Sequence, residues 1–374
     1  MKYYIIAGEA SGDLHGSNLV KGLYSEDPEA DVRFWGGDLM SHAADGFTTA
    51  SKPVLVRHYK AGAVMGIGDV LGKAGKLLKN ISFCKKDILQ WAPDVVVLID
   101  YPGFNMKIAR FCHEHGIRVF YYIAPKTWAS REGRNRKLKA WVDKLFIVFP
   151  FEIPYFTEKN VPFIYKGNPL VDAVDGHEFS RPVEGHYVAL LAGSRKGEIS
   201  RMMPVCMEAA DRLGCKVVIA GAPARSVSDY SEYIGERKNV SLIFGRTYDI
   251  LKYADAAIIN SGTASLEAAL IGTPQVVCWS TSAVTAFVAR SILHVLDNVK
   301  YISLGNLCID KLAFREFIQE DFTAENVEKE IRALIEDTDY RNAMIEDYSR
   351  IRESLGGSGA SRAVAKAMIE EIRS

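Results

Sequence analysis

The chain has 374 residues, of which 48% are hydrophobic and 25% are charged, a composition typical of a soluble globular protein of about two domains. Lys and Arg together number 46 and so do Asp and Glu, so the formal net charge is zero. This balance disfavours nucleic acid as a partner, because nucleic-acid binders usually carry a basic excess. A disordered, collagen-like or coiled-coil chain is also excluded.

The cysteine spacing and the length of the apolar runs indicate where in the cell the protein is expected. The six cysteines show neither zinc-type spacing nor a disulfide framework, which favours the reducing cytoplasm. No apolar run approaches the ~18 residues that cross a bilayer, so any membrane contact is expected at the surface.

Short apolar runs alternate with helical patterns, and the alternation starts twice. The first series of expected strands is 3–7, 32–35, 95–99, 119–123, 145–148 and 163–165. The second series is 187–191, 217–220, 241–244, 257–259 and 275–278. Many of these runs are apolar on both faces, as in buried parallel strands that helices cover. The pattern predicts an α/β fold with two Rossmann-like, doubly wound parallel-sheet domains that face a cleft.

The boundary between the two domains is expected near Gly167. This gives an N-terminal domain of residues 1–166 and a C-terminal domain of residues 167–356. A glycine-rich break at 356–359 precedes the last helix, about 357–374, which we expect to pack back on the N-terminal domain.

Two turns of the first half carry candidate chemistry. The turn at residues 8–13 has glycines that allow a ligand close to the backbone, but it lacks G-x-G-x-x-G, so NAD is disfavoured. Asp100 follows the apolar strand 95–99, where a half-buried carboxylate suits a general base. The alternative to these functional roles is that each turn only caps the helix that follows it.

Two turns of the second half suggest an anion site. Arg195 follows the strand 187–191, and a cation at a helix start favours a bound phosphate, unless the arginine is merely solvated. A small-residue helix begins near Gly262, and its free amides could hold a diphosphate. Glu267 lies one turn beyond Thr263, within reach of an attached ribose. The alternative is an ordinary packing helix with a solvated glutamate.

An apolar stripe at helical spacing runs through residues 64–81. Lysines lie beside or opposite it, as on helices that rest in an anionic membrane interface. Core packing is the alternative, and the sequence leaves both open.

These motifs, in this order, resemble those of lipid-A-disaccharide synthases from residue 3 to about 320. They are the turns at 8–13 and 193–195, Val64-Met65-Gly66-Ile67, Asp100 with 102–105, and the segments 149–152, 261–267 and 301–307. The resemblance implies a GT-B glycosyltransferase that joins UDP-2,3-diacylglucosamine to 2,3-diacylglucosamine 1-phosphate. The products are UDP and the β-1,6-linked lipid A disaccharide 1-phosphate, formed with inversion and without a metal or other cofactor.

The resemblance also implies roles for single residues. Residues 1–166 are then the acceptor domain and 167–356 the UDP-sugar donor domain. The implied catalytic residues are Asp100, Glu9 and Arg195. The implied UDP-binding residues are Arg195, Ser261, Gly262, Thr263, Ala264, Glu267 and Asn306. The implied acceptor or lipid side consists of Ser11, Asn105, Met65, Ile67, Val70 and Leu71. Whether Asp100 or Glu9 is the base stays open.

The expected partners are the two acylated sugars and the surface lipids of the inner membrane of a Gram-negative bacterium, with no nucleic acid. A homodimer is left open. The alternative functions are another UDP-sugar GT-B enzyme, such as a UDP-GlcNAc epimerase or a peptidoglycan-type transferase, and a non-catalytic protein that binds sugar nucleotides.

Overall fold

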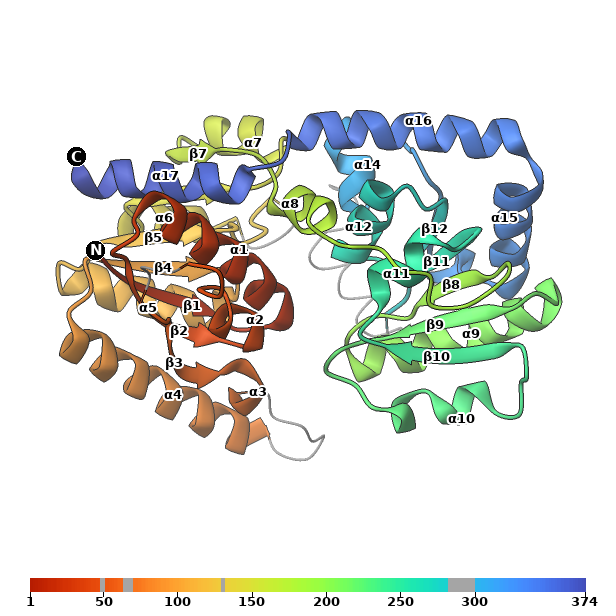
Figure 1. Cartoon of the computed structure of the whole chain (residues 1–374), viewed down its shortest axis with the longest axis horizontal. Coiled ribbons are helices and arrows are strands. Elements are labelled where there is room, and N and C mark those ends of the chain that lie inside the picture. Colours follow the sequence, from red (N-terminus) through yellow and green to blue (C-terminus); the bar gives the residue numbers. More distant parts are fainter. Residues whose placement is uncertain (48–50, 63–69, 129–131, 282–299) are drawn as a thin grey trace. The chain divides into compact units, whose positions relative to one another are not determined.

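The chain folds into two compact units. The computed structural model describes residues 1–47, 51–62, 70–128, 132–281 and 300–374, with the backbone alone at 62 and 70–74. Unit 1 consists of Met1–Ala173 and Gly356–Ser374, and unit 2 of Val174–Leu355 (Figure 1). The division falls a few residues beyond the predicted boundary, within α8 (Pro169–Asp175), because Leu170 and Val171 are buried in unit 1.

Unit 1 is built on a parallel sheet of seven strands in the order β3-β2-β1-β4-β5-β6-β7. The strands are β1 (Lys2–Ala7), β2 (Asp31–Gly36), β3 (Val54–His58), β4 (Val95–Ile99), β5 (Val119–Tyr122), β6 (Lys144–Ile147) and β7 (Phe163–Tyr165). The helices, besides α8, are α1 (Ala10–Glu26), α2 (Asp38–Ser41), α3 (Tyr59–Gly62), α4 (Val70–Trp91), α5 (Pro102–Glu114), α6 (Arg134–Trp141), α7 (Glu152–Glu158) and α17 (Ala360–Arg373).

Unit 2 repeats the plan with six parallel strands in the order β10-β9-β8-β11-β12-β13. The strands are β8 (Val188–Leu191), β9 (Val217–Gly221), β10 (Val240–Phe244), β11 (Ala256–Asn260), β12 (Gln275–Trp279) and β13 (Glu316–Ile318). The helices are α9 (Lys196–Leu213), α10 (Ser231–Ile234), α11 (Thr247–Lys252), α12 (Thr263–Ile271), α14 (Leu304–Ile309), α15 (Ala324–Glu336) and α16 (Thr338–Leu355). The predicted pair of doubly wound parallel sheets is confirmed.

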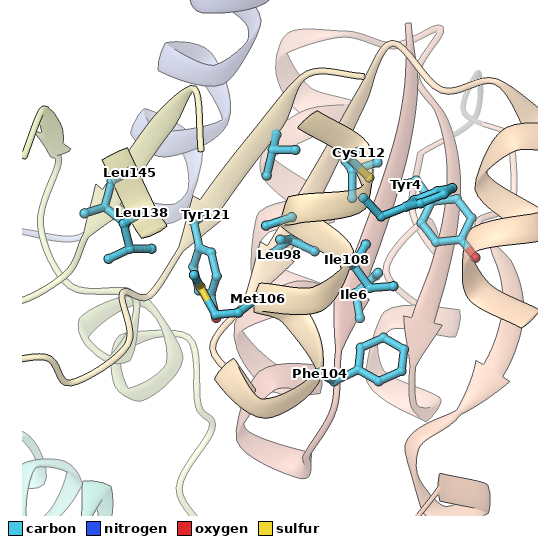
Figure 2. Packing of buried hydrophobic residues seen from close by; sticks show 14 of the residues in the cluster. Tyr4, Ile6, Leu98, Phe104, Met106, Ile108, Cys112, Tyr121, Leu138 and Leu145 are labelled. Carbon is cyan, nitrogen blue, oxygen red and sulfur yellow. The ribbon is translucent and has the colours of Figure 1, made fainter. Parts of the chain in front are cut away.

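The core of unit 1 is apolar, which limits where polar binding groups can be found. Strand side chains such as Ile6 and Leu98 pack against Phe104, Ile108 and Cys112 of α5 (Figure 2), and each of these is at most 2% exposed. Burial of such a side chain contributes roughly 1.5–3 kcal/mol. Since β4 is buried along its whole length, polar groups for binding come from the loops after the strands.

The last helix of the chain, α17, belongs to unit 1 and packs against α1 (Figure 1). A Cβ atom at Gly22 of α1 would lie 3.1 Å from the Cβ atom of Ala365, so the two helices are in close contact. The Asp172 carboxylate accepts hydrogen bonds from the backbone N–H groups of Gly359 and Ser361. It thereby satisfies two amides at the start of α17 that have no partner within the helix.

Two strands escaped the sequence prediction, β3 and β13, and both lie at sheet edges. β3 reads Val-Leu-Val-Arg-His and β13 reads Glu-Phe-Ile, so neither is an uninterrupted apolar run. Edge strands are half-solvated and commonly carry charged side chains, which removes the signal on which the prediction depended.

Candidate functional site

The loops after β1 and β4 are neighbours in unit 1. The two strands pair in parallel, with Ala7 opposite Ile99. From β1 the chain proceeds outward to β2 and β3 and then returns to β4 on the other side. This makes the β1/β4 junction a topological switch point, where open α/β sheets bind ligands. Glu9 and Asp100, the two predicted carboxylates, follow these strands directly.

The backbone after β4 is strained and held in place. Asp100 and Tyr101 both have positive φ angles, 43° and 47°. The left-handed region is unfavourable for residues other than glycine, and such strain concentrates at functional sites. The carbonyl oxygen of Asp100 accepts hydrogen bonds from the Tyr121 hydroxyl at 2.6 Å and from Asn105 Nδ2 at 2.8 Å. These side chains therefore position Asp100.

Asn105 was predicted on the acceptor side, and the structure gives it a different task. Its side chain is fully buried, and Nδ2 also donates to the carbonyl of Ile99 at 3.1 Å. Asn105 Nδ2 thereby holds the backbone at the end of β4, whereas its Oδ1 is buried without a hydrogen-bond partner among the described residues.

Tyr101 joins the two loops. A Cβ atom at Gly8 would lie 2.3 Å from the Tyr101 ring, so this close approach requires glycine. Burial raises the pKa of Tyr101, and the nearby Glu9 carboxylate raises it further. Glu9 and Ser11 are both exposed, at the start of α1. Glu9 is therefore solvent-accessible and close to the loop that carries Asp100.

Asp13 is a structural carboxylate whose role the sequence did not reveal. It is 3% exposed and accepts hydrogen bonds from the backbone N–H groups of Gly37 at 2.7 Å, Leu39 at 3.1 Å and Met40 at 3.2 Å. Asp13 thereby fixes the start of α2 beside the site. The sequence signal that could have indicated this role is an acidic residue on the buried face of an amphipathic helix.

A cavity of about 240 Å³ adjoins the β1/β4 junction in unit 1. Glu9 and Tyr101 line it on one side, and Arg57, His58 and Tyr59 line it from β3 and the start of α3. Arg57, His58 and Tyr59 were not predicted as site residues, because β3 itself was not predicted.

Unit 2 places its predicted residues at the equivalent junction. β8 and β11 pair in parallel with Leu191 opposite Ile259, and Arg195 and Ser261 lie in the loops that follow. Gly193 has a φ of 100°, and a Cβ atom there would come within 2.6–2.8 Å of Asn260 and Glu198 side-chain atoms. The turn after β8 therefore needs glycine.

The start of α9 already has an anion of its own. The Glu198 carboxylate accepts from the N–H groups of Ser194 and Arg195 at 3.0 and 3.1 Å, and it pairs with the Arg195 guanidinium at 3.1 Å. Glu198 thus supplies the anion that was expected beside Arg195, so the charge at this helix start does not by itself favour a phosphate. The Arg195 side chain is 74% exposed, so it can still reach a ligand.

The α12 segment keeps an open helix start. Thr263 begins the helix, Ala264 follows it, and a Cβ atom at Gly262 would meet no described atom within 4 Å. Ser261 Oγ donates to the carbonyl of Ile302 at 3.3 Å. Glu267 accepts a hydrogen bond from the Tyr248 hydroxyl at 2.8 Å, and burial raises its pKa. Glu267 is thus held by Tyr248 and is not a solvated surface glutamate.

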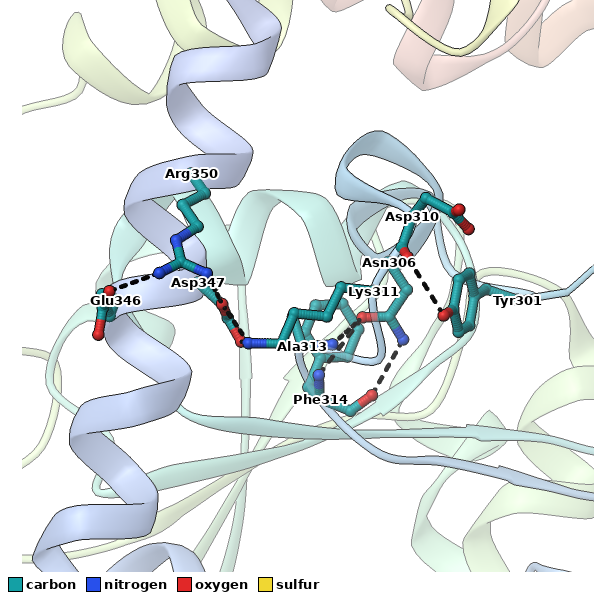
Figure 3. A network of polar contacts seen from close by, with 9 residues as sticks. All are labelled: Tyr301, Asn306, Asp310, Lys311, Ala313, Phe314, Glu346, Asp347 and Arg350. Atoms are coloured by element: carbon teal, nitrogen blue, oxygen red, sulfur yellow. Dashed lines mark hydrogen bonds and ion pairs between the residues drawn. The ribbon is translucent and has the colours of Figure 1, made fainter.

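Asn306 does not fit the predicted role of a UDP ligand. It is fully buried, and Oδ1 accepts from the N–H groups of Ala313 at 2.9 Å and Phe314 at 3.3 Å (Figure 3). Nδ2 donates to the carbonyl of Phe314 at 3.0 Å and to Glu316 Oε1 at 2.9 Å. The amide is saturated by the chain itself, so Asn306 positions the segment between α14 and β13.

Only part of the predicted stripe at 64–81 lies within the described residues. Met65 and Ile67 lie outside the described residues, and so do the side chains of Val70 and Leu71. Further along α4, Ile81 is 6% exposed and Leu77 packs against the core, whereas Leu78 is 60% exposed. The end of the stripe is therefore core, with Leu78 on the surface.

The described residues contain neither a cluster of metal ligands nor a membrane-spanning helix. Within residues 1–47, 51–62, 70–128, 132–281 and 300–374, no three His, Cys, Asp or Glu side chains are grouped as a metal site requires. No helix in these ranges is long and apolar enough to span a membrane.

Solved structures with the same fold define the class. A UDP-GlcNAc 2-epimerase from Neisseria meningitidis bound to UDP-GlcNAc matches with a TM-score of 0.68 at 13% identity, covering 99% of this chain and 100% of that one. The glycotransferase of kitacinnamycin matches with a TM-score of 0.64 at 14% identity, covering 99% and 98%. At such low identity the likeness concerns the fold, which is GT-B.

Sequence relatives identify the family within this class. The family model described as lipid-A-disaccharide synthetase matches residues 3–370. Lipid-A-disaccharide synthase of Syntrophus aciditrophicus is 36% identical over 96% of this chain and 95% of its own length, and that of Trichlorobacter lovleyi is 33% identical over 98% and 97%. The chain belongs to the lipid-A-disaccharide synthetase family. It is accordingly a glycosyltransferase of lipid A biosynthesis.

Proposed function

We propose that this enzyme transfers the sugar of UDP-2,3-diacylglucosamine to the 6-hydroxyl of 2,3-diacylglucosamine 1-phosphate with inversion at the anomeric carbon. The acceptor O6 forms a bond to the anomeric carbon, the bond from that carbon to the UDP oxygen breaks, and UDP leaves with the electron pair. The proton of the 6-hydroxyl passes to a carboxylate of unit 1. Family membership favours this reaction over the epimerase and the non-catalytic binding protein.

The pair of carboxylates at the β1/β4 switch point supports the proposal that unit 1 deprotonates the acceptor hydroxyl. Asp100 follows β4 on a strained backbone held by Tyr121 and Asn105, and such preorganisation suits a general base. Glu9 is the second candidate because it is exposed on the adjacent loop.

Unit 2 is proposed to hold the UDP group. The open amides at the start of α12 suit the diphosphate, and Arg195 has an exposed guanidinium that suits the charge of the leaving group. Glu267 is proposed to bind the ribose through Oε2, the carboxylate oxygen to which Tyr248 does not donate.

We also propose that unit 1 contacts the inner-membrane surface, since both substrates carry acyl chains. Large hydrophobic side chains are exposed on α4, namely Leu78, Phe83 and Leu89. Exposed apolar side chains of one helix can enter the interface of a bilayer.

The test uses purified protein, both diacylated sugars and mass spectrometry of the products. The proposal expects UDP and the disaccharide 1-phosphate in equal amounts, and an unchanged yield in EDTA. Hydrolysis or epimerisation of UDP-GlcNAc without disaccharide would support the epimerase alternative, and UDP binding without turnover would support the binding protein.

A further inference from the structure

The cavity beside the β1/β4 junction has a wall of aromatic rings. The rings of Trp35 and Phe104 lie 5.3 Å apart, and Phe104 stacks on Tyr101 at 5.6 Å. All three line the cavity, together with Tyr59. Flat apolar surfaces of this kind suit the faces of a sugar ring. The cavity, at about 240 Å³, is smaller than the roughly 300–1,000 Å³ of pockets for drug-sized ligands, so one sugar-sized group fits it best.

Arg57 brings an incompletely satisfied cation to this cavity. The register of β2 and β3 places Arg57 opposite Trp35, and its guanidinium carbon lies 5.7 Å from the Trp35 ring centre. The Nε atom of Arg57 is buried and finds no hydrogen-bond acceptor among the described residues. Buried donors without an acceptor are rare and unfavourable, and a guanidinium matches the oxygens of a phosphate.

His58 adds a second donor. Its Nδ1 accepts a hydrogen bond from the Lys60 N–H at 3.1 Å, so Nε2 carries the ring proton. Nε2 lies 3.5 Å from Oδ1 of Asp38, whose side chain is 74% exposed. Among the described residues that line the cavity, Glu9 is the acid, and Arg57 and His58 are the basic side chains.

We propose that this cavity binds the phosphorylated sugar headgroup of the acceptor, with Arg57 and His58 on the phosphate and the aromatic wall on the sugar. The acyl chains remain outside the cavity. The inference rests on the proposed function for the identity of the acceptor, and it adds the group that recognises the acceptor's phosphate.

The kinetic test compares Arg57→Gln and His58→Asn with the wild type. Loss of a charge-assisted hydrogen bond to phosphate should raise the KM of the acceptor about 10- to 100-fold, with kcat and the KM of the UDP-sugar nearly unchanged. The effect should disappear with an acceptor that lacks the phosphate. Arg110→Gln is the matched control, because Arg110 is an exposed arginine of α5 paired with Glu114.

A binding test by calorimetry keeps this inference separable from the proposed function. Wild-type protein should bind glucosamine 1-phosphate more tightly than glucosamine or inorganic phosphate, and Arg57→Gln should remove the preference over glucosamine. If inorganic phosphate binds as tightly, the site takes free phosphate and the headgroup assignment is overturned. An active wild type with an unchanged acceptor KM in both variants refutes the cavity assignment alone. An inactive wild type refutes the proposed function, and the binding result then decides the inference.

Discussion

Asp100 lies on a backbone that most residues avoid, and other side chains hold it there. Its φ of 43° belongs to the left-handed region, which asparagine and aspartate tolerate better than other non-glycine residues. The variant Asp100→Asn therefore removes the charge and keeps the conformation.

We expect Asp100→Asn to lower kcat by about 10²–10⁴, because the acceptor hydroxyl loses its base. UDP affinity, measured by calorimetry, should not change. Near-normal turnover would assign the role to Glu9, so Glu9→Gln is the companion variant.

A variant of Asn306 can show whether this residue positions the chain or binds UDP. We expect Asn306→Ala to destabilise unit 2 by about 2–4 kcal/mol, because four hydrogen bonds are lost and buried backbone groups of residues 313 and 314 lose their partner. Thermal unfolding measures this loss. Unchanged stability combined with lost UDP binding would restore the nucleotide role that the sequence suggested.

His15 makes unit 1 sensitive to acid. Burial lowers the pKa of His15 from 6.5 to about 4, so the folded protein holds the neutral imidazole. As the pH falls below 6.5 the unfolded chain takes up a proton that the folded chain does not. Stability is therefore complete above pH 6.5 and is lost as the pH falls toward 4.

We expect this linkage to remove about 2 kcal/mol of the unfolding free energy between pH 7 and pH 5. Urea unfolding of His15→Gln at both pH values should show a correspondingly smaller loss than the wild type. An equal loss in both proteins would contradict the linkage.

At the scale of elements, α4 shows how one helix serves two environments. Leu77 and Leu78 are adjacent and chemically identical, yet Leu77 packs on the core and Leu78 is 60% exposed. The turn of a helix alone separates them, since successive residues differ by about 100° around its axis.

This pair provides a matched test of membrane contact. Leu78→Ser should change the unfolding free energy by less than ~0.5 kcal/mol, whereas Leu77→Ser should cost about 1–3 kcal/mol. If α4 contacts lipid, Leu78→Ser should weaken flotation with anionic vesicles about tenfold. Undiminished flotation of Leu78→Ser would argue against contact through this residue.

At the scale of the whole molecule, each unit has its own parallel sheet. Two calorimetric transitions are therefore expected, and Asn306→Ala identifies the one that belongs to unit 2. A ligand stabilises the part of the chain to which it binds.

UDP at 100 times its Kd should stabilise unit 2 by about 2.7 kcal/mol and raise the Tm of its transition by about 5–10 °C. The transition of unit 1 should stay in place. Glu267→Ala should reduce the shift if Glu267 binds the ribose. A shift confined to the transition of unit 1 would contradict the proposal that unit 2 binds UDP.

Much of this protein follows from local sequence patterns. Continuous apolar runs predicted the inner strands of both sheets. A strand that helices cover on both faces needs apolar side chains at successive positions. The turns after β1, β4, β8 and β11 were recognised because small or polar residues follow such runs directly. The order of these motifs also gave the family, which the comparisons confirm.

Tertiary structure decided what each polar side chain does. Nothing in the sequence distinguishes an asparagine that binds a ligand from Asn105 and Asn306, whose partners are backbone groups and, for Asn306, also the Glu316 carboxylate. Glu198 likewise supplies the anion at the start of α9. Arg57 belongs to an edge strand that is not a continuous apolar run, and its cavity is lined by residues of β1, β2, β3, α3, α4 and α5. The partners of Asn105, Asn306 and Glu198 lie within ten residues of them, and the backbone conformation and burial imposed by packing decide which of these groups each side chain bonds. Local periodicity therefore determined the framework, and packing assigned the side chains.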